Sequence, residues 1–322
     1  MNEFDLIRQY FETPSVNRAD VPLGIGDDCA LVQPKPGFQL AITTDTMVDG
    51  IHFDSRLSPA DIGHKLLAVN LSDLAAMGAE PCWISLATTL PEVNEHWLAG
   101  FSEGLFALAR EFDVSLIGGD VTRGALTLSI TAQGQVAAGK ALTRSGANVG
   151  DLIYVSGHLG DAALALNHSQ ITQLPKDQQQ QLEQRLFRPS PRVSLGQALV
   201  GYATACIDLS DGLSVDLGHL LKRSGKGASL MLDQVPTSSI ARNLLGHEQA
   251  AKLAFSGGDD YELCFTVPAH HQEAIETIST DAETPVTLIG QVTSDSGLKL
   301  RFNDVPVNWK SQGFMHFYDQ DQ

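Results

Sequence analysis

The stretch HKLLAVNLSDLAAMGAEP, residues 64–81, has the composition and the ends of a buried helix. Its apolar side chains lie nearly all round the helical projection, so we expect the rest of the fold to cover it on every side. Gly78 and Pro81 are residue types that end helices, and they follow the last apolar residues of the stretch. The sequence therefore predicts a helix inside a hydrophobic core.

Asp73 is a polar exception within this helix, together with Asn70 one turn earlier on the same face. A buried, ionised carboxylate is stable only beside a cationic side chain or a metal ion. No Lys or Arg lies three or four residues from Asp73 in either direction. A cationic partner from elsewhere in the chain remains open, but the pattern favours a metal ion.

Strands and further helices flank this core helix. The runs FQLAITTD (38–45) and WISLATT (83–89) indicate strands, and LTLSITA (126–132) alternates apolar and polar residues as a half-buried strand does. Residues 4–11 and 97–112 carry apolar side chains at helical spacing. We expect the first part of the chain to form helices packed on a largely antiparallel sheet.

The Gly-rich polar segment GKALTRSGANVGD (139–151) predicts a boundary between an N-terminal domain, residues 1–140, and a C-terminal domain, residues 141–322. The run Gln178–Gln181 is expected to lie on a solvated surface. Beyond the boundary, strand and helix patterns alternate at 151–166, 203–208, 213–225 and 262–267. The sequence predicts an α+β protein with helices covering the second sheet as well.

The balance of charge excludes several classes of partner. The chain of 322 residues carries 21 Lys and Arg against 38 Asp and Glu, a net charge of −17. Such a chain is a poor ligand for nucleic acid or for an anionic membrane surface.

The sequence shows no charged-then-apolar leader and no run of 18 apolar residues, and its four cysteines are widely scattered. We expect a cytoplasmic protein with mostly buried thiols.

Aspartates recur in short polar stretches after glycine or after an apolar run, as in LIGGDVTRG (116–124) and LAFSGGDD (253–260). Any one of them is by default a turn or N-cap residue, but their joint occurrence indicates a shared function. Oxygen ligands suit Mg²⁺, Mn²⁺ or Ca²⁺, while HxxxH and CxxC pairs and EF-hand loops are absent. We expect the aspartates to converge from separate strand ends on Mg²⁺ that is shared with substrate phosphates.

The familiar nucleotide-binding signatures are missing. The chain contains neither a P-loop nor the protein-kinase HRD and DFG motifs, and GIGDDC (24–29) lacks the third glycine of a dinucleotide fingerprint. If the protein handles ATP, it does so with a different scaffold.

Seven motifs, taken in order, resemble those of the thiamine-monophosphate kinases, in the superfamily of aminoimidazole ribonucleotide synthetase. They are GIGDDCALV, TTDTMVDGIHF, NLSDLAAMGAEP, IGGDVTRG, VSGHLGD, DLSDGL and GGDDYEL. The resemblance implies a two-domain α+β fold with an N-terminal sheet domain that dimerises and a C-terminal α/β sandwich domain. It further implies Mg²⁺-dependent transfer of the γ-phosphate of ATP to thiamine monophosphate, giving thiamine diphosphate and ADP, with several Mg²⁺ ions and a homodimer.

The same resemblance implies roles for individual residues. The implied metal ligands are Asp28, Thr43, Thr44, Asp45, Asp73, Asp120, Asp208 and Asp211. Of these, Asp45, Asp73, Asp120 and Asp211 are the expected catalytic carboxylates. The implied ATP contacts are Gly119, Asp120, Arg144 and Ser210. The implied thiamine-phosphate contacts are His52, Asp259 and Phe314. Asp27 and Asp260 remain alternatives for their neighbours Asp28 and Asp259.

Two other functions stay open. One is a different ATP-dependent enzyme on the same scaffold, such as aminoimidazole ribonucleotide synthetase or selenophosphate synthetase. The latter resemblance would predict a reactive cysteine near the N-terminus, whereas the first cysteine, Cys29, lies inside a metal motif. The other is a catalytically silent protein that binds Mg²⁺ and nucleotide.

Overall fold

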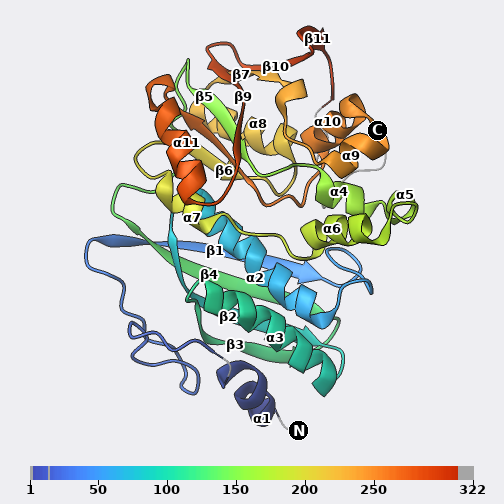
Figure 1. Ribbon diagram of the computed structural model, residues 1–322. Helices are drawn as coiled ribbons and strands as arrows, with labels where there is room; N and C mark the ends of the chain where they lie inside the picture. The colour runs from blue at the N-terminus through green and yellow to red at the C-terminus, as the bar shows by residue number, and fades with distance from the viewer. Residues whose placement is uncertain (1–2, 14, 311–322) are drawn as a thin grey trace, which may run out of the picture. The chain divides into compact units, whose positions relative to one another are not determined.

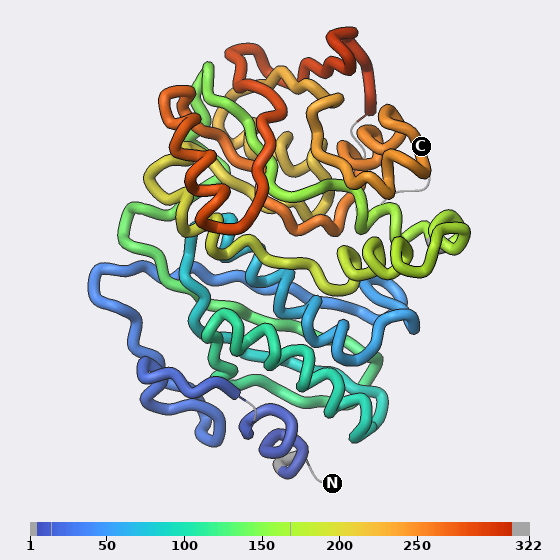
Figure 2. Tube along the Cα trace, in the orientation of Figure 1, coloured from blue at the N-terminus to red at the C-terminus, as the bar shows by residue number. Residues whose placement is uncertain are grey.

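The computed structural model describes residues 3–13 and 15–310 and divides the chain into two compact units (Figures 1 and 2). The N-terminal unit comprises the chain up to Leu74 together with Ala79–Ala141. The C-terminal unit comprises Ala75–Gly78 and the chain from Leu142 onward. Each unit is built around its own sheet.

The described residues of the N-terminal unit form a four-stranded sheet in the order β1-β4-β2-β3. Its strands are β1 (Phe38–Val48), β2 (Glu80–Leu90), β3 (Ser115–Arg123) and β4 (Thr127–Ala137). β4 pairs antiparallel with both β1 and β2, while β2 and β3 are parallel because helix α3 (Glu95–Glu111) connects them. Helices α2 (Pro59–Ala76) and α3 lie on one face of the sheet (Figure 1), which confirms the sequence prediction.

Local sequence signals set both ends of α2. Ser58 and Asp61 bond reciprocally: the Ser58 hydroxyl donates to Oδ2 of Asp61 at 2.7 Å and accepts the Asp61 amide at 3.2 Å, with Pro59 at the first helical position. At the other end Gly78 has φ +65°, and the amide of Ala79 donates to the carbonyl of Leu74 at 2.9 Å. Residues 65–72 between these ends are buried, as predicted.

The described residues of the C-terminal unit form a seven-stranded sheet in the order β11-β10-β7-β9-β5-β8-β6. Neighbouring strands are antiparallel except β7 and β10. The strands are β5 (Leu152–Ser156), β6 (Ala205–Asp208), β7 (Gly227–Met231), β8 (Leu263–Val267), β9 (Val286–Thr293), β10 (Gly297–Phe302) and β11 (Val305–Val307).

Helices fill the space around this sheet. One buried cluster joins α8 (Leu213–Ser224) to the sheet, and a second joins α4 (Asp161–Leu166), α6 (Lys176–Phe187) and α9 (Ser239–Leu245). The remaining described helices are α1 (Glu3–Ile7), the π-helix η1 (Arg8–Glu12), α5 (His168–Ile171), α7 (Val193–Ala198), η2 (Leu232–Gln234), α10 (His247–Ser256), η3 (Ala269–His271) and α11 (Gln272–Asp281). Figure 1 shows α4 and α6 next to each other at one side of the unit.

The expectation that the aspartates follow strand ends is wrong in several places. Asp45 and Asp120 lie inside β1 and β3, because pairing with β4 and β2 extends these strands to Val48 and Arg123. The run before Asp259 is the last turn of helix α10, which buries Ala250, Ala251, Ala254 and Phe255 at helical spacing.

Several surface and burial predictions are testable in the structure. Of the run Gln178–Gln181, predicted to be solvated, Gln180 and Gln181 are exposed whereas Gln178 and Gln179 are half-buried, because the amphipathic helix turns part of the run toward the side that buries Leu182 and Leu186. Cys82, Cys206 and Cys264 are buried free thiols, whereas Cys29 is an exposed one. Among the described helices, none has both the length and the apolar character needed to cross a bilayer.

Candidate functional site

Thr43, Asp45 and Asp73 come together where β1 meets α2. Thr43 and Asp45 are two residues apart on a strand, so their side chains leave the same face of the sheet. The Thr43 hydroxyl donates to Oδ2 of Asp73. Burial first, and then the nearby charge of Asp73, raise the pKa of Asp45 to about 6. A cation beside the two carboxylates would favour the ionised form of both.

The donor chemistry of this group fits a divalent cation. Carboxylate and hydroxyl oxygens are the ligands that Mg²⁺ prefers. Asn70 on the same helix is fully buried, and its Oδ1 has no hydrogen-bond partner within residues 3–13 and 15–310. Over that same part of the chain, no three His, Cys, Asp or Glu side chains gather as a metal-binding group. At this site the electrostatic interaction between carboxylates is that of Asp45 with Asp73.

Thr44 is separated from its neighbours by the pleat of the strand. Its side chain leaves the opposite face of β1, is exposed, and hydrogen-bonds the hydroxyl of Thr131 on β4 at 2.9 Å. The hydroxyls of Thr43 and Thr44 thus point to different sides of the sheet.

Asp28, Gly119 and Asp120 line one cavity of about 620 Å³ in the N-terminal unit. Its wall also includes the apolar side chains of Ile7, Phe11, Leu86 and Leu116. A cavity with an apolar wall and a carboxylate rim suits a ligand that has a flat, uncharged part and a cation-bound anionic part. The sequence indicated a helix at 4–11, but nothing in it placed that helix at this cavity.

Gly119 allows β3 to approach β2 at this cavity. A Cβ atom at this position would collide with the carbonyl oxygen of Leu86, its partner in the parallel ladder. The next residue, Asp120, is exposed, and its carbonyl accepts the Thr88 hydroxyl at 3.3 Å. The glycine is therefore required by packing, and it brings the carboxylate of Asp120 to the cavity wall.

His52 is held in a tight turn after β1. Its Nδ1 accepts the amide of Val48 at 3.0 Å, so Nε2 carries the proton in the neutral ring. Gly50 in this turn has φ +76°, a conformation that favours glycine. The imidazole is half-buried, with its position fixed by the backbone.

Asp208, Ser210 and Asp211 lie where β6 ends and α8 begins. Asp208 is the last residue of β6 and is buried. Asp216, in the first turn of α8, accepts the amides of Asp211 and Gly212, each at 3.0 Å. Burial first, and then the charge of Asp211, raise the pKa of Asp216 to about 7. The sequence did not single out Asp216, although a carboxylate five residues after Asp211 is within reach of the loop.

Arg144 lies in the same unit. Its guanidinium acts on Asp216, lowering the pKa of that carboxyl, and the Ser224 hydroxyl donates to its carbonyl at 3.1 Å. The side chain is exposed, and a guanidinium can bind a phosphate through two hydrogen bonds.

Asp259 belongs to a loop that pairs with the Asp208–Asp211 segment. Its amide donates to the carbonyl of Ser210 at 2.8 Å, and its Oδ1 accepts the hydroxyl of Tyr261 at 3.1 Å. Of the predicted site residues, Asp208, Ser210, Asp211 and Asp259 are thus brought together in the C-terminal unit. Phe314 lies outside the described residues.

Family models identify the class of this fold. Residues 26–136 match the AIR synthase related protein, N-terminal domain, and residues 148–303 match the corresponding C-terminal domain. The chain is 48% identical to the thiamine-monophosphate kinase of Haemophilus influenzae, covering 98% of each chain. It is equally similar to that of Escherichia coli K12, again over 98% of each chain. The chain belongs to the thiamine-monophosphate kinase family of AIR synthase related proteins.

Solved structures agree with the sequence relatives. The crystal structure of thiamine-monophosphate kinase from Stenotrophomonas maltophilia superposes with a TM-score of 0.87 at 46% identity, covering 95% of this chain and 98% of that chain. A structure of AaThiL complexed with AMPPCP and TMP superposes with a TM-score of 0.77 at 28% identity, covering 98% and 96%. These matches extend over both units.

Proposed function

We propose that this chain transfers the γ-phosphate of ATP to thiamine monophosphate, giving thiamine diphosphate and ADP, in a Mg²⁺-dependent reaction. The observation that carries this proposal is the 48% identity to thiamine-monophosphate kinases over 98% of the chain. The AaThiL relative binds AMPPCP, an ATP analogue, together with TMP, which is the pair of ligands this reaction requires.

The carboxylates of both units are suited to hold Mg²⁺ with the substrate phosphates. In the N-terminal unit these are Asp28, Asp45, Asp73 and Asp120, and in the C-terminal unit Asp208 and Asp211. When bound, Mg²⁺ neutralises phosphate charge and lowers the barrier to phosphoryl transfer. We assign Asp45, Asp73, Asp120 and Asp211 the catalytic role. Thr43 and Thr44 are also proposed as metal ligands. Only the hydroxyl of Thr43 faces Asp73, so the two threonines would bind metal through different atoms.

ATP is assigned to the cavity beside Gly119 and Asp120, whose apolar wall suits a nucleobase. In the C-terminal unit, Arg144 and Ser210 are assigned to ATP on the family resemblance. His52, Asp259 and Phe314 are assigned to thiamine monophosphate. Because Nδ1 of His52 accepts the Val48 amide, Nε2 is the donor nitrogen of the neutral ring, which is the polarity that an anionic phosphate oxygen requires.

Transfer is direct in this scheme. The attacking oxygen belongs to a phosphate monoester whose second pKa is about 6, so it is ionised near neutral pH and needs no strong base. The protein's task is to bring two polyanions into line and to balance their charge. Labelled phosphate that moved from ATP to the protein, and from there to thiamine monophosphate, would contradict this route.

We further propose that the protein is a cytoplasmic homodimer whose N-terminal sheets pair. The face of β1 opposite α2 exposes Leu40 and Ile42, at 43% and 63% of their surface. Apolar side chains on an edge strand are unfavourable in water unless another surface covers them.

The decisive experiment incubates the purified protein with ATP, Mg²⁺ and thiamine monophosphate and separates the products by chromatography. We expect thiamine diphosphate and ADP in equal amounts, and none when EDTA replaces Mg²⁺. ATP binding without any product would favour the silent binding protein. ATP hydrolysis or transfer only with another acceptor would favour a different enzyme of the superfamily.

A further inference from the structure

Glu262 is a fully buried carboxylate that the proposed reaction does not use. It accepts two hydrogen bonds from Arg192, from Nε at 2.7 Å and from Nη2 at 2.6 Å. It also accepts Nη2 of Arg185 at 2.7 Å and the hydroxyl of Ser156 at 2.6 Å. Burial opposes ionisation, but the hydrogen bonds and charges of the arginines outweigh it and hold the pKa of Glu262 below its usual value.

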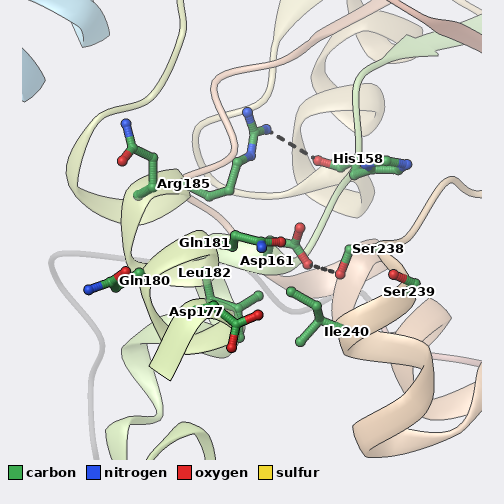
Figure 3. Close-up of a pocket in the computed structure, with 11 residues that line it drawn as sticks. His158, Asp161, Asp177, Gln180, Gln181, Leu182, Arg185, Ser238, Ser239 and Ile240 are labelled. Carbon is green, nitrogen blue, oxygen red and sulfur yellow. Dashed lines mark hydrogen bonds between the residues drawn. The ribbon is translucent and has the colours of Figure 1, made fainter. Parts of the chain in front are cut away.

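This network joins parts of the C-terminal unit that are distant in sequence. Arg185 comes from the last turn of α6, Arg192 directly precedes α7, and Ser156 ends β5. Figure 3 shows Arg185 reaching from α6 toward the carbonyl of His158, to which its Nη2 is 3.4 Å away. A Cβ atom at Gly157 would collide with the Glu262 carboxylate, so the chain after β5 passes directly over it.

Asp259 lies in a loop that leads directly to Glu262. Two residues of this loop have an unfavourable backbone conformation. Asp259 has φ +66° and Tyr261 has φ +50°, both in the left-handed region that side chains disfavour. Such residues persist only where the surrounding structure fixes them, and they concentrate at functional sites.

Contacts on both sides of Asp259 supply that restraint. Both carboxylate oxygens of the buried Asp260 accept the amide of Gly160, each at 3.0 Å. The amide of Tyr261 donates to the carbonyl of Leu209, and the amide of Leu209 donates to the carbonyl of Glu262, each at 2.8 Å. Glu262 is therefore the fixed end of the loop, and its position depends on the two arginines.

We propose that Arg185, Arg192 and Glu262 are positioning residues that hold Asp259 in the conformation in which it binds thiamine monophosphate. This inference rests on the proposed function and assigns the motif GGDDYEL a second role beyond its aspartates. Ser210 is bonded to the same loop through the Asp259 amide, but Asp216 gives its segment a second support by accepting the neighbouring amides of Asp211 and Gly212, so we expect the nucleotide contact to change less.

The test compares Arg192→Lys with the control Val292→Ala. The lysine keeps the buried charge but loses the two-point contact with Glu262. Val292 is buried in β9 of the same unit, so its truncation lowers stability without touching the network. We expect Arg192→Lys to raise KM for thiamine monophosphate about tenfold, because tenfold is the scale of one lost hydrogen bond to a charged group, here the bond to Glu262. We expect KM for ATP to change less than about twofold, and Val292→Ala to change neither KM.

A double-mutant cycle shows whether the network acts through Asp259. In an Asp259→Ala background, Arg192→Lys should raise the Kd for thiamine monophosphate, measured by calorimetry, by less than about twofold. Arg185→Lys provides the same comparison if Arg192→Lys fails to fold. A full tenfold effect in the Asp259→Ala background, or an active Arg192→Lys that behaves like Val292→Ala, would overturn the inference alone. A wild type that forms no thiamine diphosphate would overturn the proposed function and this inference with it.

Discussion

The hydroxyl of Thr43 in β1 donates a hydrogen bond to the carboxylate of Asp73 in α2. This contact joins the strand and the core helix at the point where Asp45, two residues along the strand, also faces the helix. Residues 30 positions apart in sequence thereby form one polar group against a largely apolar helix. Because the pair of carboxylates carries negative charge into a partly buried place, it is where we expect a cation to have the largest effect.

We predict that Asp45→Asn, Asp73→Asn and Asp120→Asn each reduce kcat at least about 100-fold at saturating Mg²⁺, the scale of one lost electrostatic contact in a transition state. The measurement is the initial rate of thiamine diphosphate formation. Asp281→Asn, at an exposed position of α11, is the matched control and should retain the wild-type rate. Near-normal rates in all three variants would show that these aspartates do not hold the metal.

Asp45→Asn should also stabilise the metal-free protein. Burial and the charge of Asp73 raise the pKa of Asp45 from 3.8 to about 6, so ionised Asp45 costs stability in the fold. The cost is absent below the unfolded pKa and complete above about pH 6, where it is at most about 3 kcal/mol. In EDTA at pH 7.5 we expect Tm to rise by roughly 2–6 °C, with a smaller gain at pH 4. An unchanged or lower Tm at pH 7.5 would contradict the prediction.

A charged side chain on the exposed face of β1 should prevent the protein from forming a dimer. Ile42→Asp places a charge on the proposed dimer surface and should convert the protein to a monomer, measured by light scattering after size-exclusion chromatography. Val93→Asp is the control, because Val93 is 54% exposed in the loop before α3. If the Ile42 variant keeps the mass of the wild type, β1 is not the interface.

Removing the charge of Glu262 should destabilise the C-terminal unit in a pH-dependent way. The folded pKa of Glu262 lies below 4.5, so its ionised form contributes stability above that pH and the contribution is lost as pH falls through the folded pKa. Glu262→Gln should therefore cost about 3–5 kcal/mol at pH 7, the scale for breaking a buried ion pair. The deficit relative to wild type, measured by urea unfolding, should shrink below pH 4.5; a deficit independent of pH would mean that charge is not its cause.

Phe314 and Trp309 should behave differently although both lie near the C-terminus. Trp309 packs on Phe255 and Phe302, with ring centroids 6.3 and 5.6 Å away, so Trp309→Ala should lower Tm. Phe314 is assigned to the cationic thiazolium ring by family resemblance, a contact of about 0.5–2 kcal/mol. Phe314→Ala should raise KM for thiamine monophosphate but not for ATP. Equal effects on both substrates, with a lower Tm, would indicate that Phe314 only packs the tail.

The sequence by itself determined the features that depend on neighbours along the chain. Helix α2 could be predicted because Gly78 and the apolar residues between its ends are local signals, and the half-buried strand β4 because its alternation is local too. The family could be identified from the order of the short aspartate motifs, because a comparison of sequences does not need the positions of these residues in space.

Only the tertiary structure decided which of these residues meet. Pairing with β4 and β2 extends β1 and β3 beyond Asp45 and Asp120. Side chains alternate along β1, so Thr43 and Thr44 lie on opposite faces of the sheet. Glu262 and its arginines are 70 and 77 positions apart, so no periodicity or spacing could associate them. Their contact depends on how helices and strands pack around a buried charge, which is a property of the folded chain and not of any segment of it.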